Sequence, residues 1–267
     1  MSMLVTILGC GSSGGVPRPA LGWGDCNPDN PKNRRRRTSL LVERRSKTGV
    51  TRALVDTSPD LREQLLDAKV DWLDAVLYSH EHADHCHGID DLRCLYIHRR
   101  RRVPVYLDPR TLKVMLARFG YCFESPPGSD YPPIVHAFPL TAGQSLTIDG
   151  EGGPINVLPL LQDHGDIQSL GFRVGPLAYS CDLKDLPPES ALALAGLDVW
   201  IVDALRYKPH PSHFCVEESL AWIARLNPKR AILTNLHSDL DYDGLKRNLP
   251  ANVEPAYDGL QIEFPDC

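Results

Sequence analysis

The chain has 267 residues, 42% hydrophobic and 24% charged, a composition typical of a soluble globular protein rather than a disordered one. Its 29 basic and 34 acidic residues give a formal net charge of -5, which argues against a protein that coats nucleic acid or a membrane surface, because both need a positive field. The apolar run at residues 4–8 is too short for a signal peptide or a membrane span, so we expect a cytoplasmic protein with no membrane partner.

Short apolar runs rich in β-branched residues alternate with helical patterns along the chain. The runs predict strands at residues 4–9, 39–43, 52–56, 75–79, 103–107, 155–160, 170–174, 177–181, 199–203 and 230–234. Apolar residues at helical spacing predict helices at residues 89–96, 112–119 and 216–226. The alternation indicates an α/β protein. A linker-like, proline-rich stretch at residues 124–133 lies between two strand-rich halves.

Three other patterns are weaker guides to function. The glycines of Gly9-x-Gly11-x-x-Gly14 follow a strand, as in a dinucleotide-binding loop, but prolines interrupt the helix that such a loop needs. The 8 cysteines, the last of them Cys267, form no C-x-x-C pair, so we interpret them as reduced thiols. The arginine runs at residues 34–37 and 99–102 are interpreted as solvated charges, with phosphate attraction as the functional alternative.

The most informative segment holds four side chains of metal-ligand type within six positions: His80, His82, Asp84 and His85. A predicted strand ends directly before it, and in extended backbone the i, i+2 spacing points His80 and His82 to the same side. A helical pattern begins near residue 88, so Asp84 and His85 can turn toward the same point. With 10 histidines in the whole chain, such a group is improbable by chance. The segment predicts a site for one metal ion or two adjacent ions.

The pattern His-x-His-x-Asp-His in this segment resembles the hallmark of the metallo-β-lactamase superfamily. The resemblance implies an αββα sandwich, two mixed sheets flanked by helices, as a single domain over residues 1–267. It also implies further ligands at strand ends in a fixed chain order, for which the sequence offers His164, Asp182 and His237. Asp56 matches the early aspartate that supports the metal loop without itself binding the ion.

The resemblance also implies how these residues share two divalent ions, zinc or manganese. The first ion takes His80, His82 and His164, the second takes Asp84, His85 and His237, and Asp182 is shared. Such ions lower the pKa of a bound water from about 15.7 toward about 7, which provides a hydroxide at neutral pH. Asp84 and His213 are the candidate catalytic residues. His213 lies in a loop at a strand end, and its ordinary pKa of about 6.5 suits proton donation to a leaving oxygen.

Within the superfamily, residues 9–17, 31–37 and 210–213 resemble the phosphodiesterase branch, in particular the phosphoribosyl cyclic phosphodiesterases of the carbon-phosphorus lyase pathway. This resemblance implies a metal-dependent hydrolase that opens a small cyclic or nucleotide-like phosphodiester through a hydroxide held by two metals. Those relatives carry a cysteine cluster for a structural zinc, where this chain has only Cys26. A third, structural metal is therefore in doubt.

Three other functions use the same framework. A thioester or lactone hydrolase shares the ligands but normally adds C-terminal basic groups, and no matching segment follows His237. A tRNA-processing nuclease needs a long flexible arm, which the sequence does not contain, so we expect no large nucleic acid partner. A nucleotide-binding protein with little turnover is disfavoured by the intact ligand set. Self-association as a homodimer stays open.

Overall fold

The structure, a computed structural model, describes residues 1–265, so Cys267 lies outside the described part. The chain divides into two compact units. The first unit consists of Met1–Thr6, Ser39–Asn156 and the chain from Gln261 on, and the second consists of Ile7–Thr38 and Val157–Leu260. The single domain predicted from the sequence stays a prediction.

The first seven-stranded sheet belongs mainly to the first unit. Its strands are β1 (Ser2–Gly9), β2 (Ser39–Ser46), β3 (Gly49–Val55), β4 (Ala75–Leu77), β5 (Val103–Leu107), β6 (Val135–Pro139) and β14 (Gln261–Pro265). Their order is β14-β1-β2-β3-β4-β5-β6. The pairs from β3 to β6 are parallel, whereas β2 pairs with β3, and β1 with β14, in antiparallel fashion. The sheet is therefore mixed.

The helices of the first unit follow its parallel strands. They are α1 (Leu61–Asp67), α2 (Ala83–Cys86), the 3-10 helix η2 (Ile89–Leu92), α3 (Arg93–Arg99) and α4 (Pro109–Phe123). All three residues of β4 are buried and apolar, as expected for a strand inside a parallel sheet. The α4 helix begins where the Asp108 carboxylate accepts hydrogen bonds from the backbone N–H groups of Arg110 and Thr111.

The second seven-stranded sheet lies mostly in the second unit. Its strands are β7 (Leu146–Ile148), β8 (Ile155–His164), β9 (Ile167–Val174), β10 (Leu177–Ser180), β11 (Val199–Asp203), β12 (Arg230–Thr234) and β13 (Val253–Pro255). Their order is β13-β12-β11-β10-β9-β8-β7. The strands β10 to β13 pair in parallel, while β9 is antiparallel to both β8 and β10. This sheet is mixed as well.

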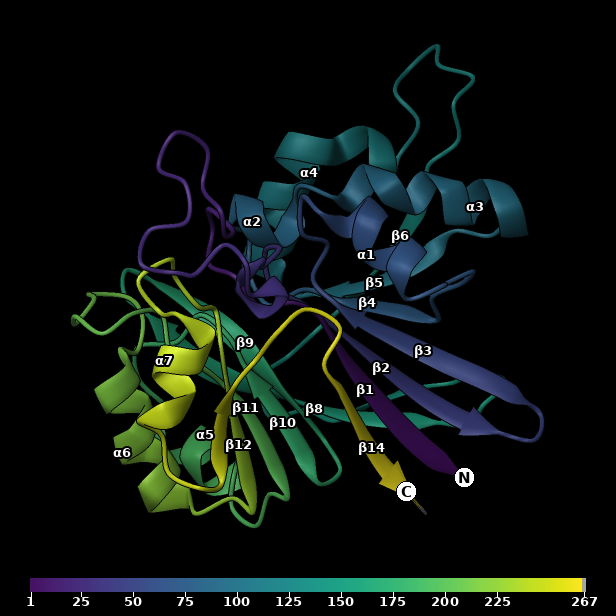
Figure 1. The fold of residues 1–267 in the computed structure, drawn as a ribbon. Helices are drawn as coiled ribbons and strands as arrows, with labels where there is room; N and C mark the ends of the chain where they lie inside the picture. Colours follow the sequence, from purple (N-terminus) through teal and green to yellow (C-terminus); the bar gives the residue numbers. More distant parts are fainter. Residues whose placement is uncertain (266–267) are drawn as a thin grey trace. The chain divides into compact units, whose positions relative to one another are not determined.

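Helices cover the parallel strands of the second sheet. They are α5 (Pro188–Ala193), α6 (Val216–Leu226) and α7 (Tyr242–Arg247), and a 3-10 helix, η1 (Pro31–Asn33), lies earlier in the chain. Figure 1 shows α5, α6 and α7 beside β10, β11 and β12. Trp200 of β11 lies in the core between them, fully buried, and its indole N–H donates to Ser180 Oγ at 3.1 Å. The apolar residues that predicted the helix at 216–226 pack against this core.

One edge of the second sheet collects the ends of four strands. The strands β10, β11 and β12 are parallel, and β8 runs in the same direction because β9 is antiparallel to both β8 and β10. The residues at or just after these four strand ends are His164, Asp182, Asp203 and Asn235. Functional groups gather at such carboxyl edges in α/β proteins.

The predicted α/β class with two mixed sheets flanked by helices is confirmed. The stretch 124–133 connects α4 to β6 inside the first unit, so it does not separate two halves as its position suggested. Between residues 1 and 265, no helix is long and apolar enough to cross a membrane.

Candidate metal centre

The predicted histidine segment lies in the first unit and runs from the loop after β4 into α2. His80 is buried, and His82 precedes α2 with extended backbone angles (φ -65°, ψ 151°). The ring centroids of His80 and His82 are 4.5 Å apart, and those of His80 and His85 are 4.3 Å apart. Asp84 Oδ2 lies 3.5 Å from His85 Nε2. The structure therefore brings together the four residues that the sequence pattern singled out.

A buried carboxylate, Asp56, orients this segment. It follows β3 with φ of 63°, in the left-handed region that Asp and Asn adopt more readily than other residues with a Cβ atom. Its Oδ1 accepts from the backbone N–H of Ser79 at 2.7 Å. Its Oδ2 accepts from Ser79 Oγ at 2.7 Å and lies 2.8 Å from His85 Nδ1. Because the Nδ1–H of His85 points to a carboxylate, its Nε2 is the nitrogen oriented to bind a metal.

The second unit has a donor cluster of its own at the strand edge described above. His164 Nε2 lies 3.5 Å from Asp182 Oδ2, and the rings of His164 and His213 are 4.6 Å apart. His164 is oriented through its Nδ1, which lies 2.7 Å from the carbonyl oxygen of Ser212. Asp182, Asp203 and His213 each place one potential ligand atom within 4.8 Å of the others. Asp182, like Asp56, is held at a positive φ (51°) directly after a strand.

His213 is held by a carboxylate that the sequence analysis did not identify. Its Nδ1 lies 2.8 Å from Asp203 Oδ2, and its Nε2 lies 3.9 Å from Asp182 Oδ2. Asp203 is fully buried, and burial raises the pKa of this carboxyl group, although the nearby His213 opposes the shift. The imidazole thus has one nitrogen fixed by Asp203 and the other directed at the donor cluster.

His237 does not join this cluster. Its Nε2 lies 2.6 Å from Nη1 of Arg18, and its Nδ1 lies 3.1 Å from Asp239 Oδ1. Burial, followed by the positive charge of Arg18, lowers the pKa of His237 below its ordinary value. Asn235 does join the cluster, because its Nδ2 lies 3.0 Å from Asp182 Oδ1 and 3.1 Å from Asp203 Oδ1.

The sequence analysis missed Asp203 and Asn235 for different reasons. The pattern predicts Asp203 only as the last residue of a strand, although a carboxylate at the end of the apolar run Val199–Asp203 is itself a signal of a functional site. Asn235 lies two residues before His237, and a histidine matches the expected metal ligand better than an asparagine does. The signal that both share is a polar residue at or directly after the end of a buried strand.

Two arginines of the run at 34–37, Arg35 and Arg36, bind other residues of the chain. Arg35 is buried, and its guanidinium donates to the carbonyl oxygens of Leu240 (2.7 Å) and His237 (3.2 Å). Arg36 forms an ion pair with Asp258 at 3.1 Å. The interpretation of this run as solvated charge was wrong for Arg35, whose hydrogen bonds to buried carbonyls compensate for its desolvation.

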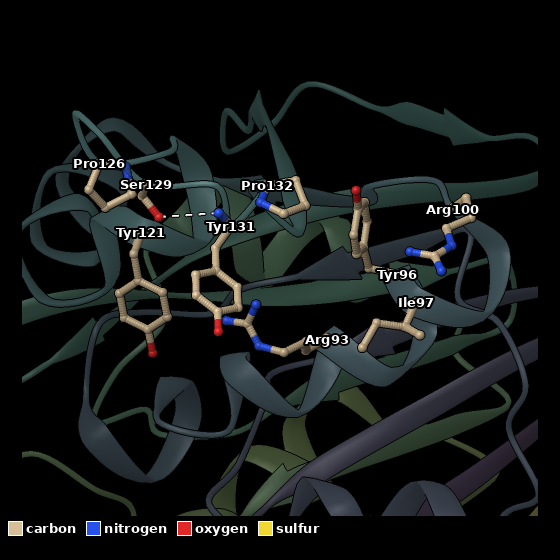
Figure 2. Close-up of a pocket in the computed structure, with 9 residues that line it drawn as sticks. All are labelled: Arg93, Tyr96, Ile97, Arg100, Tyr121, Pro126, Ser129, Tyr131 and Pro132. Atoms are coloured by element: carbon tan, nitrogen blue, oxygen red, sulfur yellow. Dashed lines mark hydrogen bonds between the residues drawn. The ribbon is translucent and has the colours of Figure 1, made fainter.

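A cavity of about 430 Å³ lies in the first unit, between α3 and the stretch after α4. Figure 2 shows Arg93 beside Tyr131, and Arg100 beside Tyr96, around this cavity. None of the predicted ligands or catalytic residues lines it. The cavity therefore gives no support to the candidate metal centre.

The donor chemistry of the two clusters fits divalent transition metals. The first unit supplies three imidazoles and the Asp84 carboxylate, and the second supplies imidazoles together with Asp182 and Asp203. Imidazole nitrogen and carboxylate oxygen are ligands for zinc, manganese and iron. Several of these side chains are also oriented by hydrogen bonds through their second polar atom, as is usual for metal ligands.

Comparison with known proteins agrees with this chemistry. Residues 51–235 match the Beta-lactamase superfamily domain, and the chain belongs to this superfamily of metal-dependent hydrolases. It is similar to a crystal structure described as a new diphosphatase from the PhnP family, with 33% sequence identity, a TM-score of 0.88, and coverage of 99% of this chain and 98% of the other. The superfamily predicted from the histidine pattern is confirmed. The branch resemblance given in the sequence analysis is confirmed by the similarity to this PhnP-family protein.

Two curated proteins are also similar. An octanoyltransferase of Porphyromonas gingivalis is 33% identical over 264 residues, which are 97% of this chain and 51% of that protein. A Ribonuclease Z of Bradyrhizobium sp. is 30% identical over 174 residues, which are 63% of this chain and 52% of that protein. The chain thus spans about half the length of the curated relatives that it matches.

Proposed function

We propose that this chain is a metal-dependent phosphodiesterase that acts on a small cyclic or nucleotide-like phosphodiester. The observation that carries the proposal is the pair formed by Asp203 and His213 at 2.8 Å, with His213 Nε2 directed at the donor cluster of the second unit. A phosphodiester has an alkoxide leaving group, which departs poorly unless it receives a proton. In this proposal His213 provides that proton.

The metal ligands of the proposal are those that the superfamily pattern implies. The first ion takes His80, His82 and His164, the second takes Asp84 and His85, and Asp182 is shared. His237 is left out of this set because its Nε2 accepts from Arg18. When bound, two divalent ions, zinc or manganese, polarise a phosphoryl oxygen and make a water nucleophile available at neutral pH.

The residues of the chain have distinct tasks in this scheme. Asp56 and Ser79 orient His80 and His85 as ligands, through the buried hydrogen bonds between them. Asp203 holds the Nδ1–H of His213, so that the proton to be donated lies on Nε2. The buried Asp203 carboxylate stabilises the protonated imidazole that serves as the acid. Asp84 is proposed to act both as a ligand and as a catalytic carboxylate.

Two relatives bear on the choice of substrate. The PhnP-family protein is described as a diphosphatase, which supports phosphoryl chemistry at this type of site. The similarity to an octanoyltransferase favours a second candidate, the hydrolysis of an acyl thioester or lactone by the same ligands. A thiolate leaves without a proton, so hydrolysis of a thioester gives His213 no task, whereas the alkoxide released from a lactone would still need one.

An assay panel separates the two candidates. Metal-free protein is reloaded with Mn²⁺ or Zn²⁺ and offered a ribosyl 1,2-cyclic phosphate, a 2′,3′-cyclic nucleotide, bis(4-nitrophenyl) phosphate, 4-nitrophenyl phosphate, an octanoyl thioester and a lactone. We expect turnover of the diesters, with the monoester acting at best as a product-like ligand. Efficient thioester cleavage without diesterase activity under either metal would overturn the proposal.

A further inference from the structure

Asn235 occupies the central position in the donor cluster of the second unit. It follows β12 directly, is 2% exposed, and has φ of 61°. Its side-chain nitrogen lies 3.0 Å from Asp182 Oδ1 and 3.1 Å from Asp203 Oδ1. An amide nitrogen carries two hydrogens, so both are directed at carboxylates of the cluster.

Asn235 also makes a close contact with His213, and this contact is not a hydrogen bond. Its Nδ2 also lies 3.2 Å from His213 Nδ1. That ring nitrogen is 2.8 Å from Asp203 Oδ2, and a carboxylate can only accept, so Nδ1 carries the hydrogen and is not an acceptor for Asn235. The two amide hydrogens therefore serve Asp182 and Asp203.

His237 binds Arg18 and does not join the donor cluster. A guanidinium has donors and no acceptor, so the 2.6 Å contact from Arg18 Nη1 occupies the lone pair of His237 Nε2. A ring nitrogen has one lone pair and cannot give it to a metal at the same time. Arg18 in turn donates through Nη2 to Ser12 Oγ at 3.2 Å. His237 thus helps to hold Arg18 in place.

We infer that Asn235, and not His237, takes the last position at the metal centre, where it positions the shared ligand Asp182. This inference deepens the proposed function and rests on it. The imidazole that the superfamily pattern implies at this position is then missing. A shell without this imidazole binds Zn²⁺, which suits imidazole ligands, more weakly than a shell with three imidazoles.

The test is a metal titration that uses no substrate. Metal-free protein is titrated with Mn²⁺ and with Zn²⁺ by isothermal calorimetry, and the bound ions are counted by elemental analysis. We expect the wild-type protein to bind one Zn²⁺ ion roughly 10-fold or more tightly than the other, since one shell lacks an imidazole. Two ions of equal affinity would contradict the inference.

Four variants sharpen the test. Asn235→Gly removes the amide and tolerates the positive φ, and we expect it to weaken metal binding roughly 10- to 100-fold, as losing an orienting partner does. Asn235→His supplies the missing imidazole and should tighten the weaker ion by roughly 10-fold or more. His237→Gln keeps an acceptor for Arg18 and should match both the wild type and the control variant His136→Gln, whose histidine lies on an exposed part of β6.

The decisive contrary result is the loss of one ion in His237→Gln while Asn235→Gly keeps both. Circular dichroism establishes that each variant is folded, and if Asn235→Gly is not, Asn235→His and His237→Gln still decide the question. A different result would refute the proposed function. A wild-type protein that binds no divalent metal refutes the phosphodiesterase proposal, whereas loss of metal in His237→Gln refutes only the assignment of Asn235.

Discussion

The substitution His213→Asn removes the ring nitrogen that we propose donates the proton, Nε2, and keeps a hydrogen-bond donor near the position of Nδ1. In the structure Nδ1 lies 2.8 Å from Asp203 Oδ2 and Nε2 lies 3.9 Å from Asp182 Oδ2. An asparagine amide can keep the hydrogen bond to Asp203 while placing nothing at the Nε2 position. Alanine is a poorer choice, because it would remove the imidazole from the buried Asp203 carboxylate and leave that carboxylate with only the hydrogen bonds from Asn235 and the backbone N–H of Leu183.

The expected loss follows from the task assigned to His213. Removing a general acid lowers turnover by roughly 10²- to 10⁴-fold, which corresponds to about 3–5 kcal/mol in the activation free energy. The assay compares kcat for an alkyl cyclic diester with kcat for bis(4-nitrophenyl) phosphate, whose leaving group departs without a proton. We expect the full loss for the alkyl diester, a much smaller loss for the aryl diester, and an unchanged metal content.

Two results would refute this reasoning about His213. Equal losses for alkyl and aryl leaving groups would indicate a role in binding the substrate or in stabilising negative charge on the phosphoryl oxygens. Loss of a metal ion from His213→Asn would make the histidine a ligand. Asp203→Asn is the companion variant, and we expect it to show the same dependence on the leaving group, because it removes the charge that orients and stabilises the imidazolium.

Four other perturbations test separate parts of the account. Asp182→Ala should lose metal and activity together, because the shared carboxylate offsets the repulsion between two adjacent cations; full metal content by elemental analysis would contradict this. Asp56→Ala should weaken metal binding roughly 10- to 100-fold in a calorimetric titration, since it orients a ligand, and unchanged affinity would exclude that role. Partial burial raises the pKa of the Asp71 carboxyl, but the charges of Arg52 and Arg99 and the hydrogen bonds to this carboxyl together outweigh burial and lower the pKa overall. The stability difference between the wild type and Asp71→Asn should therefore be present above about pH 4 and shrink as the pH falls, and a difference that grows on acidification in urea unfolding would contradict this sign. Trp200→Ala should reduce the free energy of unfolding by about 3–5 kcal/mol, and a loss below about 1 kcal/mol would show that the core of the second unit does not depend on this side chain.

The sequence predicted the central elements of both sheets because their residues are buried. The strands β5, β11 and β12 have the predicted bounds, and each is an apolar run inside a parallel part of its sheet. The strands β6, β7, β13 and β14 were missed. They are short strands of three to five residues, and β6, β13 and β14 contain proline or alternate between buried and exposed positions, so their apolar signal is weak.

The histidine segment could be predicted because its ligands are close in sequence. His80, His82 and His85 depend on one strand end and one turn, and the local spacing determines which way they point. The last position of the metal centre depends on where β12 ends. That strand ends at Thr234, so Asn235 points into the cluster and His237 lies beyond it. A two-residue difference of this kind cannot be read from the pattern alone.

The buried hydrogen bonds of Arg35 could be identified only from the structure. A run of four arginines is typical of a solvated surface, but the second unit folds the carbonyl oxygens of residues 237 and 240 around one of them. These acceptors are more than 200 positions away in the sequence. Long-range hydrogen bonds of this kind leave no local pattern.

The central claim is that this chain hydrolyses phosphodiesters with the help of bound divalent metal. The most direct test follows a ribosyl 1,2-cyclic phosphate by ³¹P NMR with the metal-free protein, with the protein reloaded with Mn²⁺ or Zn²⁺, and with the reloaded Asp182→Ala variant. The account predicts conversion of the cyclic diester to a monoester only with the reloaded wild-type protein. Equal conversion by the metal-free protein, or none under either metal while the octanoyl thioester is cleaved, would contradict it.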